Sequence, residues 1–157
     1  MRIENKGLLI KALAIPLAIG GISGWITSGS MKLFEQVNKP PLSPAGWLFP
    51  VVWTILYLLM GIASYLIAVS GEEEGKKRSA LGWYGLQLIV NFLWPIFFFN
   101  LQWFFFSFIW LLLLWLLIIQ TIRAFYEVSD TAAYLLIPYL IWVTFAGYLN
   151  LGIWLLN

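Results

Sequence analysis

The side chains in the apolar stretches of this sequence that could do chemistry are mainly indoles, phenols and amides, and the sequence contains no histidine and no cysteine. Their absence removes thiol catalysis, disulfides, the usual zinc sites and a histidine ligand for haem iron, so no metal site is predicted. Residues 47–69, 80–122 and 131–157 also contain no acidic or basic side chain. These stretches therefore lack the base and nucleophile pairs of hydrolytic enzymes and the charges of pumps and ion channels.

The amides lie close together in one apolar stretch. Gln87, Asn91 and Trp94 are spaced at i, i+4 and i+7, which places them on one face of a helix. Pro95 cannot donate a hydrogen bond to the carbonyl of Asn91, which leaves that carbonyl available. Two interpretations remain open and are compatible: Asn91 contacts a ligand, or it forms a hydrogen bond that holds neighbouring helices together.

Two aromatic stripes also occur at helical spacing. Trp53 and Trp142 lie deeper in their segments than a belt of interfacial aromatic residues requires. Aromatic walls with a few amides are typical of a pocket for a flat apolar ligand, although such stripes can also simply pack a core. The stripes consist of Phe49, Trp53 and Tyr57 in one segment and of Trp142, Phe145, Ala146 and Leu149 in another.

The elements that position these side chains follow from the composition. Of the 157 residues, 62% are hydrophobic and only 10% are charged, against about 25% charged in soluble domains. Five apolar runs have roughly the 20 residues that a helix needs to cross a bilayer. We therefore predict an all-α membrane protein, a single domain over residues 1–157, formed by a bundle of five transmembrane helices. The predicted helices are residues 8–28, 47–69, 80–99, 103–123 and 131–156.

The first run has an alternative interpretation as a signal peptide, because basic residues precede it. Gly20 and Gly24, four residues apart, favour a helix that packs closely against others in lipid. The connection 29–46 is the longest, and three prolines should make it stiff and extended. Ser43 followed by Pro44 predicts the N-cap of the second helix, and Asp130 is the expected cap of the fifth. Pro138 should kink that fifth helix.

The basic residues predict the orientation. Seven of the nine lie on the side of the N-terminus, and only Lys32 and Lys39 lie on the other side. In a bacterial cell membrane, the positive-inside rule then makes the N-terminus cytoplasmic and places the connection 29–46 outside. The net charge is only +2, and basic residues are scattered or countered by acids, so no nucleic-acid partner is predicted.

Three segments together resemble the TspO/MBR family of tryptophan-rich sensory proteins, which includes the mitochondrial translocator protein. The segments are residues 39–57, 87–95 and 138–150, followed by Trp154 and Asn157. The resemblance implies a five-helix bundle, a homodimer, and a pocket beneath the first connection that binds porphyrin or haem without needing a cofactor. Leu33 and Phe34 depart from the Trp-Tyr pair usual in this family, so we expect a lid that closes less tightly.

The resemblance and the helical spacing together predict a ligand-binding set and a lid. The predicted ligand-binding residues are Gly24, Phe49, Trp53, Tyr57, Gln87, Asn91, Trp94, Trp142, Phe145, Ala146 and Leu149. Gly24 is expected to let the first helix approach the pocket. The predicted lid contains Pro40, Pro41 and Pro44.

Three functions follow as hypotheses. The leading one is a membrane receptor or sensor that binds porphyrins and similar planar apolar ligands, with a contribution to their transport or disposal. The second is a light-dependent porphyrin-degrading enzyme, in which Trp94 and Trp142 would transfer electrons to the excited ligand. The third is a structural partner protein whose pocket is merely packed. In each case the lipid bilayer is the surrounding solvent.

Overall fold

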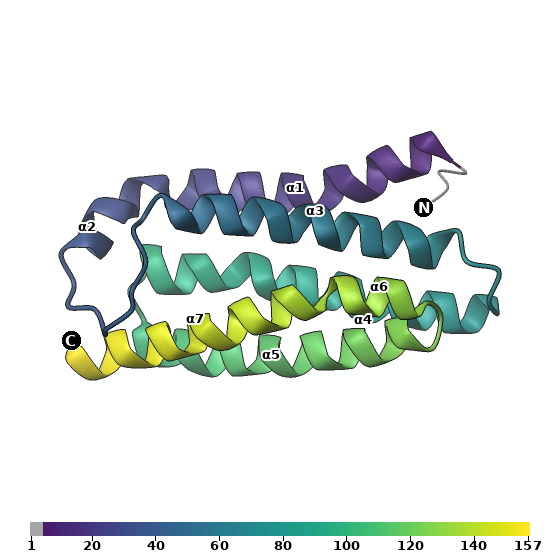
Figure 1. The fold of residues 1–157 in the computed structure, drawn as a ribbon. Coiled ribbons are helices and arrows are strands. Elements are labelled where there is room, and N and C mark those ends of the chain that lie inside the picture. Colours follow the sequence, from purple (N-terminus) through teal and green to yellow (C-terminus); the bar gives the residue numbers. More distant parts are fainter. Residues whose placement is uncertain (1–4) are drawn as a thin grey trace.

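The computed structural model describes residues 5–157, so Arg2 lies outside the described residues. Long helices run antiparallel along one axis and form an elongated bundle (Figure 1). In chain order the elements are α1 (Lys6–Thr27), the 3₁₀ turn η1 (Ser28–Ser30), α2 (Met31–Glu35), α3 (Leu48–Ala68), α4 (Glu74–Pro95), the π-helical turn η2 (Ile96–Asn100), α5 (Phe104–Tyr126), α6 (Asp130–Leu135) and α7 (Ile137–Leu156).

Five helical stretches are long and apolar enough to cross a membrane: Lys6–Ser30, Leu48–Ala68, Glu74–Asn100, Phe104–Tyr126 and Asp130–Leu156. They coincide with the five predicted runs, and the prediction of an all-α membrane protein with five spans is confirmed. The first stretch forms a span that packs against α3.

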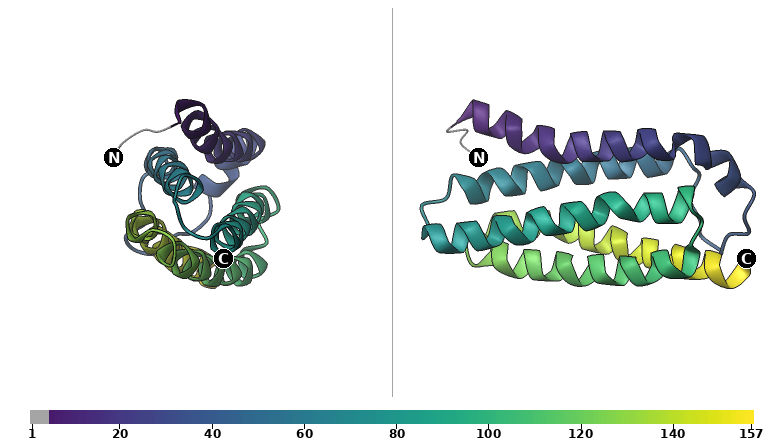
Figure 2. Two further views of the ribbon diagram at one scale, coloured as in Figure 1. Left: turned by 90° about the vertical axis from the view of Figure 1, so that its right-hand side faces the viewer. Right: turned by 180° about the vertical axis from the view of Figure 1, so that it is seen from behind.

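The neighbours of each helix follow from the short connections. In both views of Figure 2, α4 lies beside α5 and α1 lies on the outside of the bundle against α3. In addition, α5 packs against α7, and α6 packs against both α3 and α5. The core of the bundle is therefore enclosed mainly by α3, α4, α5 and the α6–α7 pair.

Two glycines allow α1 and α3 to touch. A Cβ atom on Gly61 of α3 would lie 2.8 Å from the backbone oxygen of Ala12. A Cβ atom on Gly20 of α1 would collide with the ring of Tyr57. Gly24 behaves differently: it is exposed, and a Cβ atom there would meet no described atom within 4 Å. The prediction that Gly24 brings the first helix close to the pocket is therefore wrong, and Gly20 makes the close approach instead.

Some predicted boundaries and caps are wrong. The connection 29–46 begins with η1 and α2, so only its second part is irregular. Ser43 is not an N-cap, because α3 begins at Leu48 and the Ser43 hydroxyl donates to the carbonyl of Pro40 at 2.7 Å. The cap of α6 is Ser129, whose side chain accepts from the Ala132 amide, and Asp130 is the first residue of the helix.

Proline explains two departures from regular helix. Pro138 lies in the first turn of α7, and the fifth span is divided at Leu136 into α6 and α7, which confirms the expected kink. In the third span, α4 ends at Pro95 and the helix widens into the π-helical turn η2. Such a turn changes the angular spacing of side chains relative to an α-helix, and Phe99 of this turn contacts Phe34 of α2.

Candidate functional site

A small cavity lies at the end of the bundle that is covered by the connection between α2 and α3, which we call the lid (residues 36–47). Its volume is about 20 Å³, little more than one water molecule needs. It is lined by α2, the lid, the first turn of α3, the end of the third span and the last turns of α7. The lining residues are Phe34, Lys39, Ser43, Pro44, Phe49, Trp94, Phe98, Phe99, Ala146, Leu149, Asn150 and Ile153.

Aromatic rings take up most of the space around this cavity. The ring of Phe34 lies 5.0 Å from that of Phe99, 5.7 Å from that of Phe98 and 6.4 Å from that of Phe49, measured between ring centres. Trp94 stacks on Phe98 at 4.9 Å. Phe34 is only 7% exposed, whereas the side chain of Leu33 lies outside the described ones, so the expectation of a looser lid stays a prediction. Phe34 thus acts as a plug that joins α2 to the rest of the site.

The polar groups at the cavity are few. Trp94 donates its indole N–H to the Asn150 side-chain oxygen at 3.1 Å, and the Asn150 amide donates to the carbonyl of Phe104 at 2.7 Å. Among the described residues that line the cavity, Lys39 is the only charged one. Its ammonium lies 4.9 Å from the centre of the Phe34 ring, a cation–π geometry, and donates to the carbonyls of Glu35 and Val37.

The lid is fastened to the end of α7 by reciprocal hydrogen bonds. The backbone amide of Asn38 donates to the Asn157 side-chain oxygen at 3.1 Å, and the Asn157 amide donates back to the carbonyl of Asn38 at 2.8 Å. The Tyr148 hydroxyl donates to the carbonyl of Pro41 at 2.7 Å. We call these contacts the latch. They hold the lid over the cavity by bonds that lie at its exposed rim.

Glycine makes the latch compact. Pro40 lies so close to Gly152 that a Cβ atom on this glycine would come within 2.6 Å of the proline ring. Pro40 is buried, whereas Pro41 is exposed and Pro44 is half-buried at the cavity wall. The three predicted lid prolines therefore all belong to the segment that covers the site.

Deeper in the bundle the amides form a second cluster with tyrosines. Tyr57 donates to the Asn91 side-chain oxygen at 2.9 Å, and the Asn91 amide donates to the Tyr139 hydroxyl at 2.6 Å. Tyr139 in turn donates to the Gln87 side-chain oxygen at 2.7 Å. This network joins α3, α4 and α7 in the core, where Gln87 and Asn91 are at most 2% exposed. Its geometry favours the interpretation that Asn91 holds helices together.

Apart from Gly24, the predicted ligand-binding residues divide between two places. Phe49, Trp94, Ala146 and Leu149 line the cavity. The others do not line the cavity. Tyr57, Gln87 and Asn91 belong to the hydrogen-bond network, and Trp53 stacks on Tyr57. Trp142 and Phe145 lie in a row of rings between Phe49 and Tyr148. The two places are adjacent, because Trp142 contacts Phe49 with 5.9 Å between ring centres.

Seven lining residues are outside the predicted set. Phe98 follows Trp94, Asn150 follows Ala146 and Ile153 follows Leu149 at a spacing of four residues, so continuing the helical stripes finds all three. Phe99 depends on the π-helical turn, which no periodicity indicates. Phe34, Lys39 and Ser43 come from α2 and the lid, where the sequence shows no regular period.

Known proteins are similar in sequence to this chain over most of its length. The TspO/MBR family profile matches residues 12–155. A tryptophan-rich protein TspO of Chlorobaculum tepidum is 36% identical over 98% of this chain and 99% of its own length. A protein CrtK of Rhodobacter capsulatus is 35% identical over 91% of this chain and 89% of its own, and the human translocator protein is 35% identical over 84% and 79% respectively. This five-span chain belongs to the TspO/MBR family.

Proposed function

We propose that the chain is a membrane receptor that binds a porphyrin beneath the lid. The observation that carries this proposal is the composition of the cavity wall, which is mainly apolar, contains five aromatic rings and has one cation. Porphyrins are large, flat and apolar across their rings, and they carry carboxylates on one edge. The names of the relatives, tryptophan-rich sensory protein and translocator protein, support a sensor or receptor role in a membrane.

The described conformation is closed. Sites for ligands of drug size or larger commonly have volumes of about 300–1,000 Å³, far more than the present 20 Å³. Binding would require the lid and the Phe34 plug to move away from Phe98 and Phe99. Because Lys39 contacts Phe34, the plug and the lid would move together, and the rings that they uncover would stack on the ligand.

Lys39 suits the carboxylate edge of such a ligand. Its ammonium is bound only by two backbone carbonyls and a ring face, so an anion can replace those partners in the open state. A partly desolvated pair between an ammonium and a carboxylate would stabilise the complex more than an exposed pair does.

Comparing two ligands tests this site. Metal-free protoporphyrin IX should quench the tryptophan fluorescence of the detergent-solubilised protein saturably, and Lys39→Gln should weaken its binding several-fold. The dimethyl ester of the same porphyrin has no carboxylate, so Lys39→Gln should leave its affinity unchanged. Lys32→Gln, a change at an exposed lysine of α2, is the matched control. If neither ligand binds saturably, the hypothesis of a structural partner protein is favoured instead.

Haem iron should gain no strong ligand from the protein. The sequence has neither histidine nor cysteine, so metal-free protoporphyrin should bind about as well as haem. The absorption spectrum of the haem complex checks this. A six-coordinate low-spin spectrum that disappears on changing one residue would contradict the proposal that stacking holds the ligand.

Light-dependent porphyrin degradation is the second candidate, and the position of Trp94 favours it. Trp94 lines the cavity, and its indole N–H is hydrogen-bonded to Asn150, whereas Trp142 lies one ring further away. We expect Trp94→Phe to slow any light-dependent loss of porphyrin absorbance more than Trp142→Phe does. Equal bleaching with and without protein would eliminate the enzymatic hypothesis while leaving the receptor proposal intact.

The proposed orientation places the N-terminus in the cytoplasm of a bacterial cell and the lid outside. It rests on seven basic residues on the N-terminal side against two on the lid side. A reporter fused after Asn157 should therefore read as non-cytoplasmic. A cytoplasmic signal from that fusion would reverse the orientation. The homodimer implied by the family resemblance remains a prediction, which the mass of the detergent-solubilised protein can check.

A further inference from the structure

A second hollow lies on the outer face of the bundle, between α5 and α7, and we call it the outer slot. Its volume is about 300 Å³, much larger than that of the cavity beneath the lid. The walls are almost wholly apolar and include partly exposed side chains, so the slot opens toward the surrounding lipid. The lining residues are Phe108, Leu111, Leu112 and Trp115 of α5 and Val143, Thr144, Gly147, Tyr148 and Leu151 of α7.

The slot runs along the helices. Its α5 wall extends from Phe108 to Trp115, eight residues of helix, or about 10 Å between the first and the last. Gly147 forms the floor because it has no side chain to fill the space, and a Cβ atom there would only reach ordinary contact with Leu111, at 3.8 Å.

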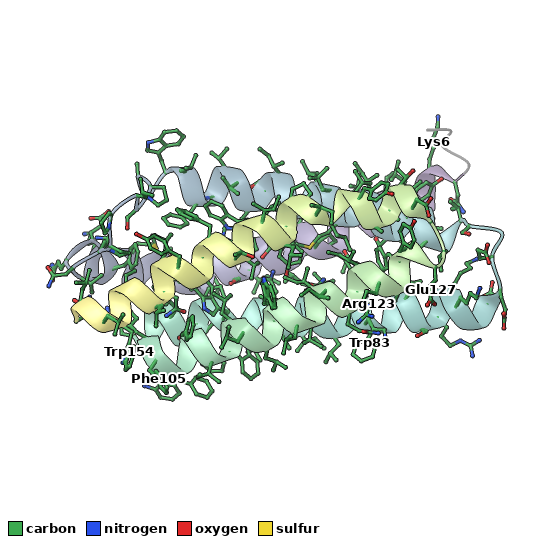
Figure 3. The ribbon with its side chains drawn as sticks, turned by 60° about the horizontal axis from the view of Figure 1, so that its bottom comes forward. Lys6, Trp83, Phe105, Arg123, Glu127 and Trp154 are labelled. Carbon is green, nitrogen blue, oxygen red and sulfur yellow. The ribbon has the colours of Figure 1, made fainter. Side chains whose placement is uncertain are left out.

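Side-chain contacts mark the two ends of the slot. At one end the Trp115 indole N–H donates to the Thr144 hydroxyl at 2.9 Å. Beyond the other end, at the lid side, Phe105 and Trp154 lie side by side in Figure 3, with 4.7 Å between their ring centres. Both of these rings are exposed, as is typical of aromatic residues at the headgroup level of a bilayer. The slot therefore extends from the lid-side headgroup region toward the middle of the membrane.

The hydrogen-bond donors of the slot are already in use. Besides the Trp115 N–H, the Thr144 hydroxyl donates to the carbonyl of Leu140 at 2.8 Å, and the Tyr148 hydroxyl donates to the carbonyl of Pro41. Every side-chain N–H or O–H on the lining residues thus has an acceptor within the protein. A ligand whose recognition depends on a carbonyl or a carboxylate would find no free donor here, whereas a plain hydrocarbon needs none.

We infer that the outer slot holds a stretch of one acyl chain of a phospholipid from the lid-side leaflet. The walls α5 and α7 pack directly against each other, so a helix of a second copy, about 10 Å across with its side chains, cannot lie between them and could insert only single side chains. A single hydrocarbon chain is narrow enough and already surrounds the protein. In lipid there is no hydrophobic driving force for binding. The affinity of the acyl chain for the slot therefore comes from van der Waals contacts with the walls, which lack partner atoms when the slot is empty.

Photolabelling in vesicles tests the inference. The probe is a phosphatidylcholine with a photoreactive diazirine in the middle of one acyl chain, and labelled peptides are identified by mass spectrometry. We expect labelling per residue of 108–115 and 143–151 to exceed several-fold that of the lipid-facing residues Ile15 and Ile22 of α1. Gly147→Leu, which puts a side chain into the slot, should remove that excess. Gly82→Leu is the matched control, because Gly82 is an exposed glycine of α4 with open space around it.

A second variant and a cysteine probe complete the test. Leu151→Trp fills the slot from its edge and should also abolish the excess, even if Gly147→Leu fails to fold. The chain has no cysteine, so Leu112→Cys supplies a single thiol at the slot. Even labelling over all lipid-facing helices overturns the inference, as does labelling that survives both filled variants. Disulfide-linked dimers of Leu112→Cys in the membrane also overturn it, because they would place a second copy at the slot. None of these results depends on porphyrin binding.

Discussion

The lid end and the middle of the bundle are built from similar side chains but are held together differently. In the middle, Tyr57, Asn91 and Tyr139 form directional hydrogen bonds, and Gly20 and Gly61 bring α1 against α3. At the lid end the contacts are mainly between rings, and the hydrogen bonds of the latch lie at the exposed rim.

Because of this difference, the stability of the folded bundle and the opening of the lid should depend on different residues. A hydrogen bond in a buried, water-free core leaves an unsatisfied group when it is broken, which costs free energy. Ring contacts tolerate sliding and exchange of partners, and rim hydrogen bonds can be replaced by water. We therefore expect the middle of the bundle to determine whether the protein stays folded and the lid end to determine whether a ligand can enter.

The largest effect should come from Asn91→Leu. The change removes two hydrogen bonds and leaves the hydroxyls of Tyr57 and Tyr139 with fewer partners, at roughly 1–2 kcal/mol per lost partner. The free energy of unfolding in detergent should fall accordingly, while the porphyrin affinity of the folded fraction changes little. Gln120→Leu, at a half-buried amide of α5 outside the network, is the control. If the porphyrin affinity falls and the free energy of unfolding does not, Asn91 belongs to the ligand site, and the middle of the bundle does not differ from the lid end in the way described.

A smaller effect, confined to binding, is expected at the cavity tryptophan. Trp94→Ala removes a stacking surface worth about 0.5–1.5 kcal/mol together with its apolar contact, so porphyrin affinity should fall about ten-fold or more. Trp53→Ala and Trp142→Ala should weaken binding by about ten-fold if the opened site extends past Phe49 to the deeper rings. Fluorescence titration of the folded variants measures this.

Trp110→Ala is the control for these substitutions. Trp110 donates its indole N–H to the carbonyl of Val90 and stacks on Phe106, away from the cavity. The pocket assignment is wrong if Trp110→Ala weakens porphyrin binding as much as the changes at the other three tryptophans while all the variants remain folded.

The smallest effect should be kinetic. Asn157→Ala removes the reciprocal bonds to Asn38, which lie in an exposed position where water can replace them. Porphyrin association, followed by stopped-flow fluorescence, should become a few times faster with the melting temperature unchanged. Tyr148→Phe, which frees the carbonyl of Pro41, should act in the same direction. An association rate that neither change alters would mean that the latch does not control entry.

The sequence predicts the spans well because hydrophobic runs and helical spacing are one-dimensional signals. Phe49, Trp94, Ala146 and Leu149 were found in this way, since each lies on the inward stripe of a long helix. Phe34 and Lys39 were missed because their positions depend on how α2 and the lid fold back across the bundle. The partners of Asn91 come from α3 and α7, and spacing along α4 contains no information about them. Phe99 depends on a change of helix type after Pro95: the proline marks an irregularity, but helical spacing does not indicate which side chains a π-helical turn brings to the cavity.

The inner parts of the spans contain no aspartate, glutamate, lysine or arginine, and this has a consequence for how the protein responds to the electrical state of the membrane. Carrying one elementary charge across a 100 mV potential corresponds to about 2.3 kcal/mol. Opening the lid moves Lys39 only at the rim, and α3, α5 from Phe104 to Ile122, and α7 carry no charge that could move through the field. The membrane potential should therefore have little effect on the free energy of opening the lid. The equilibrium between the closed and the open lid should be the same in energised and de-energised membranes.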